Sequence, residues 1–196
     1  MKIVLASTSQ YRKAILQRIL PNFTCIAPNI DEQALPNETP EKLAARLAAD
    51  KATAVASQAP NALVIGSDQV AWLEKNSKGA QLEKPGNAAR NIEQLQRCSG
   101  TSVRFYTGLS LLNTHTGKQQ TSVETYDTLF RQLSQQQIEN YVARERAFDC
   151  AGGFKMEGLG ISLFERISGD DPNTLIGLPL IQLISMLRNE GMDVLS

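Results

Sequence analysis

The sequence of 196 residues predicts an α/β fold with a mixed sheet and flanking helices. Two observations carry this prediction. Continuous apolar runs, typical of buried strands, alternate with stretches of helical periodicity, and two strand patterns around a short turn indicate a hairpin. A chain of this length buries roughly 70% of the surface that its unfolded form exposes. We therefore expect a single domain over 1–196 that needs no disulfide or structural metal.

Strands are predicted where apolar residues run without interruption or alternate with polar residues between turn signals. A polar interruption at 66–69 separates two of the strands, and the polar residues 74–81 are expected to form a loop. Residues 115–117 form the turn of the predicted hairpin. The predicted strands cover residues 3–6, 62–65, 70–73, 103–111, 121–130 and 161–167.

Helices are predicted where apolar residues recur every three or four positions. Ser134 opens a capping box, and Pro179 opens the last helix. In that helix we expect Ile181, Ile184 and Leu187 to face the core. A polar loop over 28–39 separates the first two helices. The predicted helices begin near residues 10, 41, 87, 134 and 179.

Composition and charge exclude several classes of protein. The 20 basic and 20 acidic residues give a net charge of zero, so no general positive field favours nucleic acid or an anionic membrane. No apolar run approaches the roughly 18 residues of a membrane-spanning helix. The 3 cysteines lack the spacing of a zinc site or a disulfide framework, which fits a cytoplasmic protein. With a single histidine, a metal site would need oxygen ligands.

Serines and cations share the start of the first predicted helix. Ser7 and Ser9 precede Arg12 and Lys13, yet cations are mildly unfavourable at the positive end of a helix dipole. An anion bound by backbone amides, the serine hydroxyls and Arg12 would remove this conflict and make a phosphate cradle. A solvated basic turn capped by Ser9 is the alternative, and the spacing leaves both open.

Two further charged residues stand where apolar residues are expected. Lys51 lies on the apolar stripe of the second helix, so it either extends to the edge of the core or pairs with a carboxylate or phosphate in a cleft. Asp68 comes just past the apolar run 62–65, where open α/β sheets bind ligands, although it could simply cap a turn. With Glu32 as a second carboxylate, this set predicts a phosphorylated small molecule bound with Mg²⁺ or Mn²⁺.

Eight short motifs follow one another between Leu5 and Gly191. They are Ser7-x-Ser9-x-x-Arg12, Asp31-Glu32, Leu47-Ala48-x-x-Lys51-Ala52, Gly66-Ser67-Asp68, Lys84-Pro85, Ala151-Gly152, Glu157-Gly158 and Gly177-Leu178-Pro179. This ordered set resembles the Maf family of nucleoside triphosphate pyrophosphatases, relatives of the inosine triphosphatases. The resemblance implies an elongated, strongly twisted mixed sheet with flanking helices, in two lobes with a central cleft. It also implies hydrolysis of the α-β phosphoanhydride of a nucleotide.

The resemblance also implies roles for individual residues. Asp68 would be the general base that activates a water for attack on the α-phosphorus, and Glu32 and Asp68 would bind the metal. Relatives of this kind commonly form homodimers. The polar residues expected around the triphosphate and metal are Ser7, Ser9, Arg12, Glu32, Lys51 and Lys84.

Three positions distinguish the branches of the family. Tyr11, Gln69 and Glu157 stand where the pyrimidine-nucleotide branch has Arg, Thr and Gln, and the set resembles the branch that acts on 7-methyl-GTP. The cationic ring of 7-methylguanine would stack on Tyr11, and Glu157 could accept hydrogen bonds from the guanine edge. The branch usually has Trp at the position of Tyr11. The alternatives are the same reaction on dTTP or UTP, and a nucleotide-sensing regulator of cell division.

Overall fold

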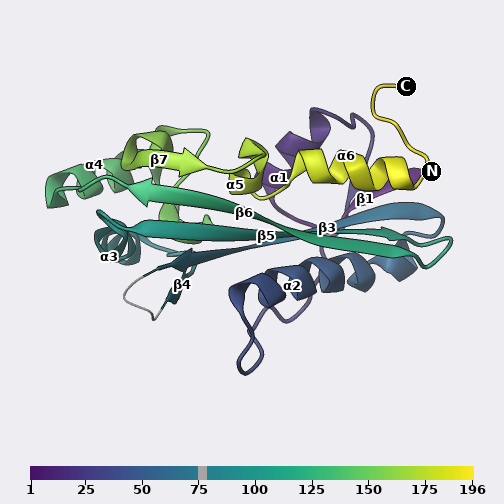
Figure 1. Ribbon diagram of the computed structural model, residues 1–196, viewed down its shortest axis with the longest axis horizontal. Helices are drawn as coiled ribbons and strands as arrows, with labels where there is room; N and C mark the ends of the chain where they lie inside the picture. Colours follow the sequence, from purple (N-terminus) through teal and green to yellow (C-terminus); the bar gives the residue numbers. More distant parts are fainter. Residues whose placement is uncertain (75–78) are drawn as a thin grey trace. The chain divides into compact units, whose positions relative to one another are not determined.

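Seven strands pair into one mixed sheet in the computed structural model, which describes residues 1–74 and 79–196 (Figure 1). The strands are β1 (Lys2–Leu5), β2 (Thr24–Cys25), β3 (Ala62–Leu73), β4 (Ala80–Leu82), β5 (Ser102–Asn113), β6 (Gln119–Phe130) and β7 (Phe164–Ser168). Their order is β2-β1-β3-β5-β6-β7, and β4 pairs with β3. β1 is parallel to β2 and β3, whereas β4 is antiparallel to β3 and β7 is antiparallel to β6. The predicted mixed α/β architecture is confirmed.

Six α-helices flank the sheet in the described residues, and five of them begin at a side chain that caps the first turn. Asp171 does so by accepting a hydrogen bond from the Asn173 amide, two residues later. Ser9, Thr39, Asn87 and Ser134 each accept a hydrogen bond from the backbone amide three residues later, and Ser134 completes the predicted capping box with Gln137. The helices are α1 (Gln10–Gln17), α2 (Pro40–Ala54), α3 (Ala88–Cys98), α4 (Gln135–Glu145), α5 (Pro172–Ile176) and α6 (Leu180–Asn189). Short 3₁₀ helices are η1 (Ala56–Gln58), η2 (Ala151–Gly153) and η3 (Leu159–Leu163).

Several predicted boundaries were wrong. The polar residues 66–69 do not interrupt the strand, because β3 runs through them from 62 to 73. Of the predicted loop at 74–81, residues 75–78 lie outside the described residues and 80–82 form β4. The late strand begins only at Phe164, since 159–163 form η3. The short elements β2 and α5 were not predicted.

The last helix presents a different face from the predicted one. Ile181 is 59% exposed, whereas Leu183 and Leu187 are fully buried. The predicted inward position of Ile181 was therefore wrong, and that of Leu187 is confirmed. Ile184, also predicted to face inward, is partly buried. Leu180 and Met186 complete the buried face of α6.

The described residues divide into two compact units. The first comprises Met1–Gln69, Thr107–Glu124 and Asp171–Ser196, and the second comprises Val70–Tyr106 and Thr125–Asp170. One domain over 1–196 stays a prediction, because such units can belong to a single domain.

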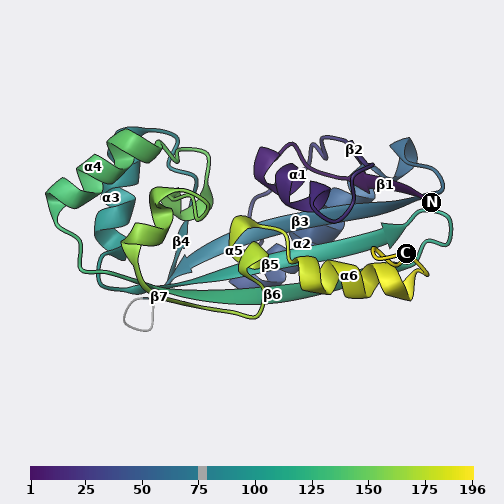
Figure 2. The same cartoon turned by 90° about the horizontal axis from the view of Figure 1, so that it is seen from above.

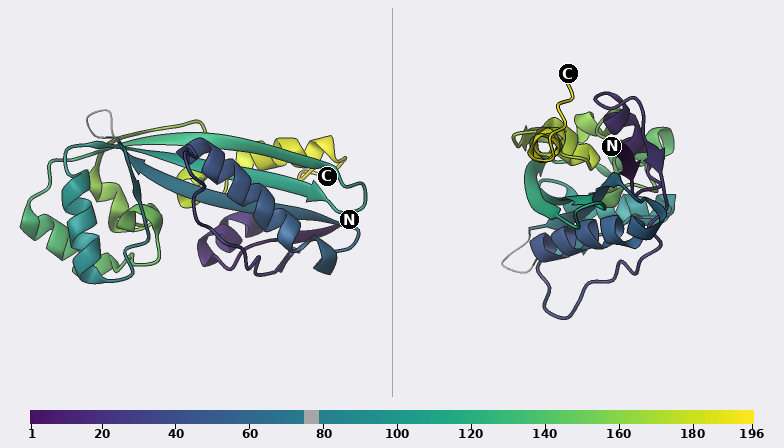
Figure 3. Two further views of the ribbon diagram at one scale, coloured as in Figure 1. Left: turned by 90° about the horizontal axis from the view of Figure 1, so that it is seen from below. Right: turned by 90° about the vertical axis from the view of Figure 1, so that its right-hand side faces the viewer.

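In the first unit, helices cover both faces of the sheet. α1 and α6 lie on one face (Figures 1 and 2), where apolar residues of β1, β3 and β5 pack against them. α2 lies on the opposite face (Figure 3), where Ala52 and Val55 pack against Val4 and Val64. Because side chains alternate along a strand, successive residues of β3 face different helices.

In the second unit, α3 packs against α4. Four phenylalanine rings form an edge-to-face cluster here, with centroid separations between 4.8 Å and 6.0 Å. They are Phe105, Phe130, Phe154 and Phe164. Among the residues that the structure describes, no helix combines the length and the apolar character needed to cross a membrane.

Candidate active site

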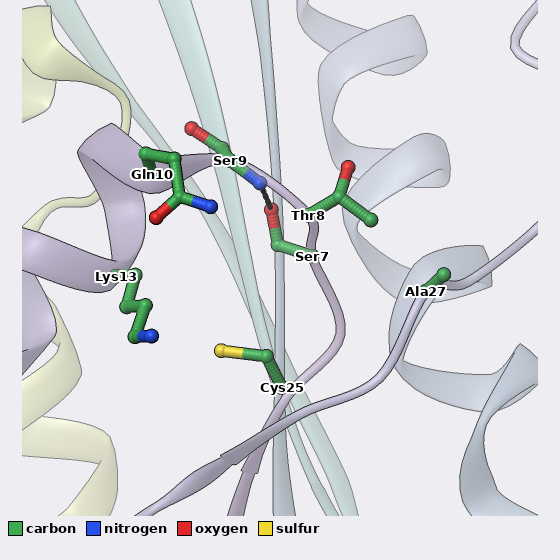
Figure 4. A pocket seen from close by; sticks show the side chains of 7 residues that line it. All are labelled: Ser7, Thr8, Ser9, Gln10, Lys13, Cys25 and Ala27. Atoms are coloured by element: carbon green, nitrogen blue, oxygen red, sulfur yellow. Dashed lines mark hydrogen bonds between the residues drawn. The ribbon is translucent and has the colours of Figure 1, made fainter.

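A pocket of about 220 Å³ opens beside the N-terminus of α1 (Figure 4). Ser7 Oγ accepts a hydrogen bond from the Ser9 amide at 3.1 Å, and Ser9 Oγ accepts one from the Arg12 amide at 3.4 Å. The predicted phosphate cradle required the amides of this turn to be available to an anion. Two of these amides are instead hydrogen-bonded to the serine hydroxyls. The pocket is lined by Ser7, Thr8, Ser9, Gln10, Lys13, Cys25 and Ala27.

The cation that lines this pocket is Lys13. Figure 4 shows its ammonium group on the same side of the pocket as the Gln10 amide, with the Cys25 thiol across from it. Arg12, the cation that the sequence predicts for the cradle, is not among the residues that line this pocket. Lys13, the next residue of α1, is exposed.

Arg12 reaches α5 and the residues after it. Its Nε donates to the carbonyl of Gly177 at 2.8 Å. Gly177 ends α5 with φ of 112°, and a Cβ built on it would lie 3.3 Å from Arg12 Nε. Burial lowers the pKa of the Arg12 guanidinium, and the negative charges of Asp68 and Glu32 oppose that change. Arg12 thus interacts electrostatically with the two predicted carboxylates, and its predicted place in the phosphate cradle stays a prediction.

Lys51 joins those two carboxylates. Its Nζ lies 2.6 Å from Asp68 Oδ1 and 2.7 Å from Glu32 Oε1. The Lys51 side chain is only 6% exposed, and that of Asp68 is 11% exposed. Of the two interpretations of Lys51, the one that pairs it with a carboxylate is confirmed. A buried ion pair of this kind is costly to desolvate, and such groups are common at functional sites.

Asp68 lies within β3, not past the end of a strand as predicted. Gly66 and Asp68 face α2, which carries Lys51. Ser67 faces the other way, with Oγ within 2.9 Å of the carbonyls of Gly108 and Gly177. Each polar side chain has a partner on its own face, and the strand therefore continues through 66–69 although its sequence is polar there.

Gln69 is oriented by α5. Its Nε2 donates to the carbonyls of Thr174 and Leu175 at 2.9 Å and 3.2 Å and lies 3.1 Å from Thr107 Oγ1. Carbonyl oxygens only accept hydrogen bonds, so the amide nitrogen must face α5. The Gln69 side-chain oxygen, an acceptor, is consequently the atom directed away from α5.

Tyr11, another predicted site residue, is partly buried on α1.

The two remaining predicted site residues belong to the second unit. Lys84 is exposed just after β4, and Glu157 is exposed in a turn between η2 and η3. The other eight belong to the first unit. Lys84 and Glu157 stay predictions.

The donor set around Lys51 fits a magnesium-type ion. Mg²⁺ in phosphate-binding enzymes is usually held by one or two carboxylates, with substrate phosphates and waters completing its shell. Asp68 and Glu32 converge on one cationic atom, so they could share a metal. In residues 1–74 and 79–196 no group of three or more His, Cys, Asp or Glu forms a complete protein cage. Two carboxylates would leave the rest of such an ion's shell to phosphate oxygens and waters.

Glu38 and Arg46 form a second ion pair near this site. Arg46 Nε lies 2.7 Å from Glu38 Oε1, and the Glu38 side chain is 8% exposed. Its hydrogen bond to Arg46 lowers the pKa of Glu38 to about 2. The sequence did not indicate this pair, because a spacing of eight residues across the start of a helix carries no specific signal.

Replacing Glu38 with glutamine is expected to lower the Tm at pH 7 by roughly 2–4 °C, as for an ion pair worth about 1 kcal/mol. The pKa of Glu38 is lower in the folded protein than its ordinary value of 4.5, so the pair stabilises the fold above that pH. This stabilisation is lost as the pH falls toward about 2. Thermal melts from pH 7 to pH 3 should show the difference narrowing below about 4.5. The exposed Glu93→Gln variant is the control, and a difference that widened in acid would contradict this assignment.

Comparison with known proteins agrees with the motif pattern. The family model described as "Maf-like protein" matches residues 2–190. The 7-methyl-GTP pyrophosphatase of Pseudoalteromonas atlantica is 50% identical over 194 residues, covering 99% of this chain and 97% of that protein. The 7-methyl-GTP pyrophosphatase of Nitrosococcus oceani is 51% identical over 193 residues, covering 98% of this chain and 95% of that protein.

One solved structure supports the fold. The Staphylococcus aureus Ham1 protein superposes with a TM-score of 0.52 over 97% of this chain and 100% of that one, at 19% identity. At that identity the likeness concerns the fold alone. The match over residues 2–190 and the full-length relatives, in contrast, show a common family. The chain therefore belongs to the Maf-like protein family, which its ordered motifs indicated.

Proposed function

We propose that this protein is a nucleotide pyrophosphatase that hydrolyses 7-methyl-GTP to 7-methyl-GMP and pyrophosphate. The observation that carries the proposal is the buried Lys51, which holds Asp68 and Glu32 together. Relatives named 7-methyl-GTP pyrophosphatase match almost the full length of the chain at about half identity. We further propose that the protein removes modified nucleotides, acts in the cytoplasm and forms a homodimer.

Asp68 is the proposed general base. Lys51 donates to Asp68 Oδ1 at 2.6 Å, so the second carboxylate oxygen is the atom that accepts a proton from the attacking water. The water oxygen forms a bond to the α-phosphorus, and the bond from that phosphorus to the α-β bridging oxygen breaks. Pyrophosphate leaves with the bridging oxygen. Lys51 keeps the carboxylate oriented and offsets its charge.

The Ser7 pocket and the cations beside it are proposed to bind the phosphates. Phosphoryl transfer depends mainly on positioning and on neutralising charge. Lys13 lines the pocket, and the Arg12 guanidinium lies near the two carboxylates. Lys84 would add a further positive charge. A divalent cation held by Glu32 and Asp68 would supply further charge neutralisation on the phosphate oxygens.

Tyr11, Gln69 and Glu157 are proposed to select the base. An aromatic ring attracts the cationic 7-methylguanine through its face. Nε2 of Gln69 donates to two carbonyls of α5, which directs the side-chain oxygen away from that helix. This oxygen would be a hydrogen-bond acceptor for the amine edge of guanine. Glu157 would be a second acceptor for the same edge.

A substrate panel tests this proposal. We expect pyrophosphate release from 7-methyl-GTP to exceed that from GTP at least tenfold in kcat/KM, because one specific recognition contact is worth about 1–3 kcal/mol. The panel contains 7-methyl-GTP, GTP, dTTP, UTP and CTP, each assayed with Mg²⁺, with Mn²⁺ and with EDTA. Full activity in EDTA would overturn the metal assignment.

The other outcomes separate the alternatives. A preference for dTTP or UTP would retain the reaction and reject the proposed selection of the base. No release from any nucleotide would reject the pyrophosphatase and favour a nucleotide-sensing regulator of cell division.

A further inference from the structure

We propose that Arg46 is a positioning residue that holds Glu32 against Lys51 by fixing the segment 31–38 to α2. Its effect on catalysis rests on the function proposed above. Its effect on the segment does not, and can be measured without any substrate. We refer to the contacts between Arg46 and residues 33–38 as the clasp.

The clasp binds the segment at two places. Arg46 Nε and Nη2 lie 2.7 Å and 2.8 Å from the two carboxylate oxygens of Glu38, which is the parallel two-bond geometry of a strong arginine pair. Nη2 also donates to the carbonyl of Gln33 at 3.0 Å. Gln33 directly follows Glu32. One guanidinium therefore fixes both the far end of the segment and the residue beside the proposed metal ligand.

The segment has few other means of staying in place. Each of residues 31–37 is exposed, so burial of apolar surface contributes little to its position. Short polar contacts shape it internally. Asp31 Oδ1 accepts from the Gln33 amide at 3.0 Å, and Glu38 Oε2 accepts from the Leu35 amide at 2.9 Å. These contacts shape the segment, but they do not attach it to α2.

The clasp and the site share one helix. Arg46 and Lys51 are both on α2 (Pro40–Ala54), and Asp50 is within 3.3 Å of Arg46 Nη1. Because Lys51 is buried and fixed by Asp68, α2 provides a rigid reference for Glu32. The Glu32 side chain is 53% exposed, so solvent weakens its half of the contact with Lys51. The clasp adds a second attachment of the segment to α2.

Arg46→Met tests the catalytic consequence. Methionine keeps an apolar stem and removes every donor of the clasp. We expect kcat/KM for the preferred nucleotide to fall about ten- to a hundredfold, which is typical when a functional group is misplaced. In a protein that already carries Glu32→Gln, adding Arg46→Met should lower kcat/KM only slightly further, because Arg46 acts through Glu32. The double variant should therefore resemble Glu32→Gln alone, and multiplicative losses would overturn the proposal.

The matched control is Arg104→Met. Arg104 also makes a two-bond pair, with Asp127, at 2.7 Å and 3.0 Å, but it belongs to the second unit. We expect kcat/KM within twofold of the wild type. A loss equal to that of Arg46→Met would show a general effect of removing such a pair and would overturn the proposal.

A second measurement needs no activity. Backbone ¹⁵N order parameters of residues 32–35 and 37 should fall from about 0.85 to below about 0.6 in Arg46→Met and stay unchanged in Arg104→Met. Glu38→Gln serves as the second variant if Arg46→Met does not fold. Unchanged order parameters in Arg46→Met would overturn the proposal that Arg46 fixes the segment. Inactivity of the wild type on every nucleotide, together with a mobile segment in Arg46→Met, would reject the proposed function and leave the clasp intact.

Discussion

Replacing Asp68 with asparagine is expected to lower kcat for pyrophosphate release by about 10²–10⁴-fold, the usual contribution of a general base. Asparagine has nearly the same shape and its side-chain oxygen can still accept from Lys51, so the 2.6 Å contact with Nζ has a replacement. It cannot accept a proton from water at neutral pH. The measurement is single-turnover release of pyrophosphate, together with the Kd of the nucleotide.

Nucleotide binding should remain measurable in Asp68→Asn, because the proposed phosphate contacts at Ser7 and Lys13 are unchanged. The control is Asp127→Asn, which removes an ion pair with Arg104 on an exposed part of the sheet. It should keep the wild-type kcat. If Asp68→Asn were to turn over at the wild-type rate with an unchanged Tm, Asp68 would not be the base. The proton would then have another acceptor, for which Glu32, the other carboxylate paired with Lys51, is a candidate.

The central elements of the fold could be predicted because their signals are local. The apolar runs of β1 and β3, the alternation of β5 and β6, and the capping box at Ser134 each follow from a few adjacent residues. β2 and α5 have only two and five residues, so no periodicity could reveal them. Their positions depend on pairing with β1 and on the contacts of Gln69 and Arg12, which involve distant parts of the chain.

The site was predictable in part for the same reason. Lys51 stood out because a charge interrupted an apolar stripe, and its pairing with Asp68 is the physical explanation. The direction of Arg12 was not predictable, because its partner Gly177 is 165 residues away. Arg46 gave no signal either. An arginine on a helix exposed to solvent is ordinary, and only the position of the segment 31–38 gives it a role.

Gly66→Ala is expected to be the most destabilising of the single substitutions considered. β3 meets α2 at this residue without a side chain between them. A Cβ on Gly66 would lie 2.1 Å from the Ala48 carbonyl oxygen and 2.8 Å from the Ala52 nitrogen. Both atoms belong to the helix backbone, so no flexible side chain can move aside. A glycine within a strand often marks such a close approach.

We expect the free energy of unfolding of Gly66→Ala to fall by about 3 kcal/mol or more, at or above the upper end for overpacked cores. For a chain of this size that corresponds to a Tm lower by roughly 6–12 °C. Thermal melts and urea unfolding measure it. The control is Gly117→Ala in the turn between β5 and β6, where φ is +75° and nothing lies within 4 Å of the added Cβ. That variant has only the left-handed backbone cost of about 1–2 kcal/mol. If both variants lost the same stability, contact of the added Cβ with α2 would not be the cause of the destabilisation in Gly66→Ala.

The same substitution connects packing with the proposed chemistry. To accommodate the new Cβ, α2 must move away from β3 near Ala48 and Ala52, and Lys51 lies between these two residues on that helix. Its Nζ should then withdraw from Asp68, which is two residues after Gly66 on the same face of β3. We therefore expect kcat to fall in Gly66→Ala at temperatures where it is fully folded, and to be unchanged in Gly117→Ala. A stable Gly66→Ala with normal kcat would mean that the distance from α2 to β3 does not control the orientation of Asp68.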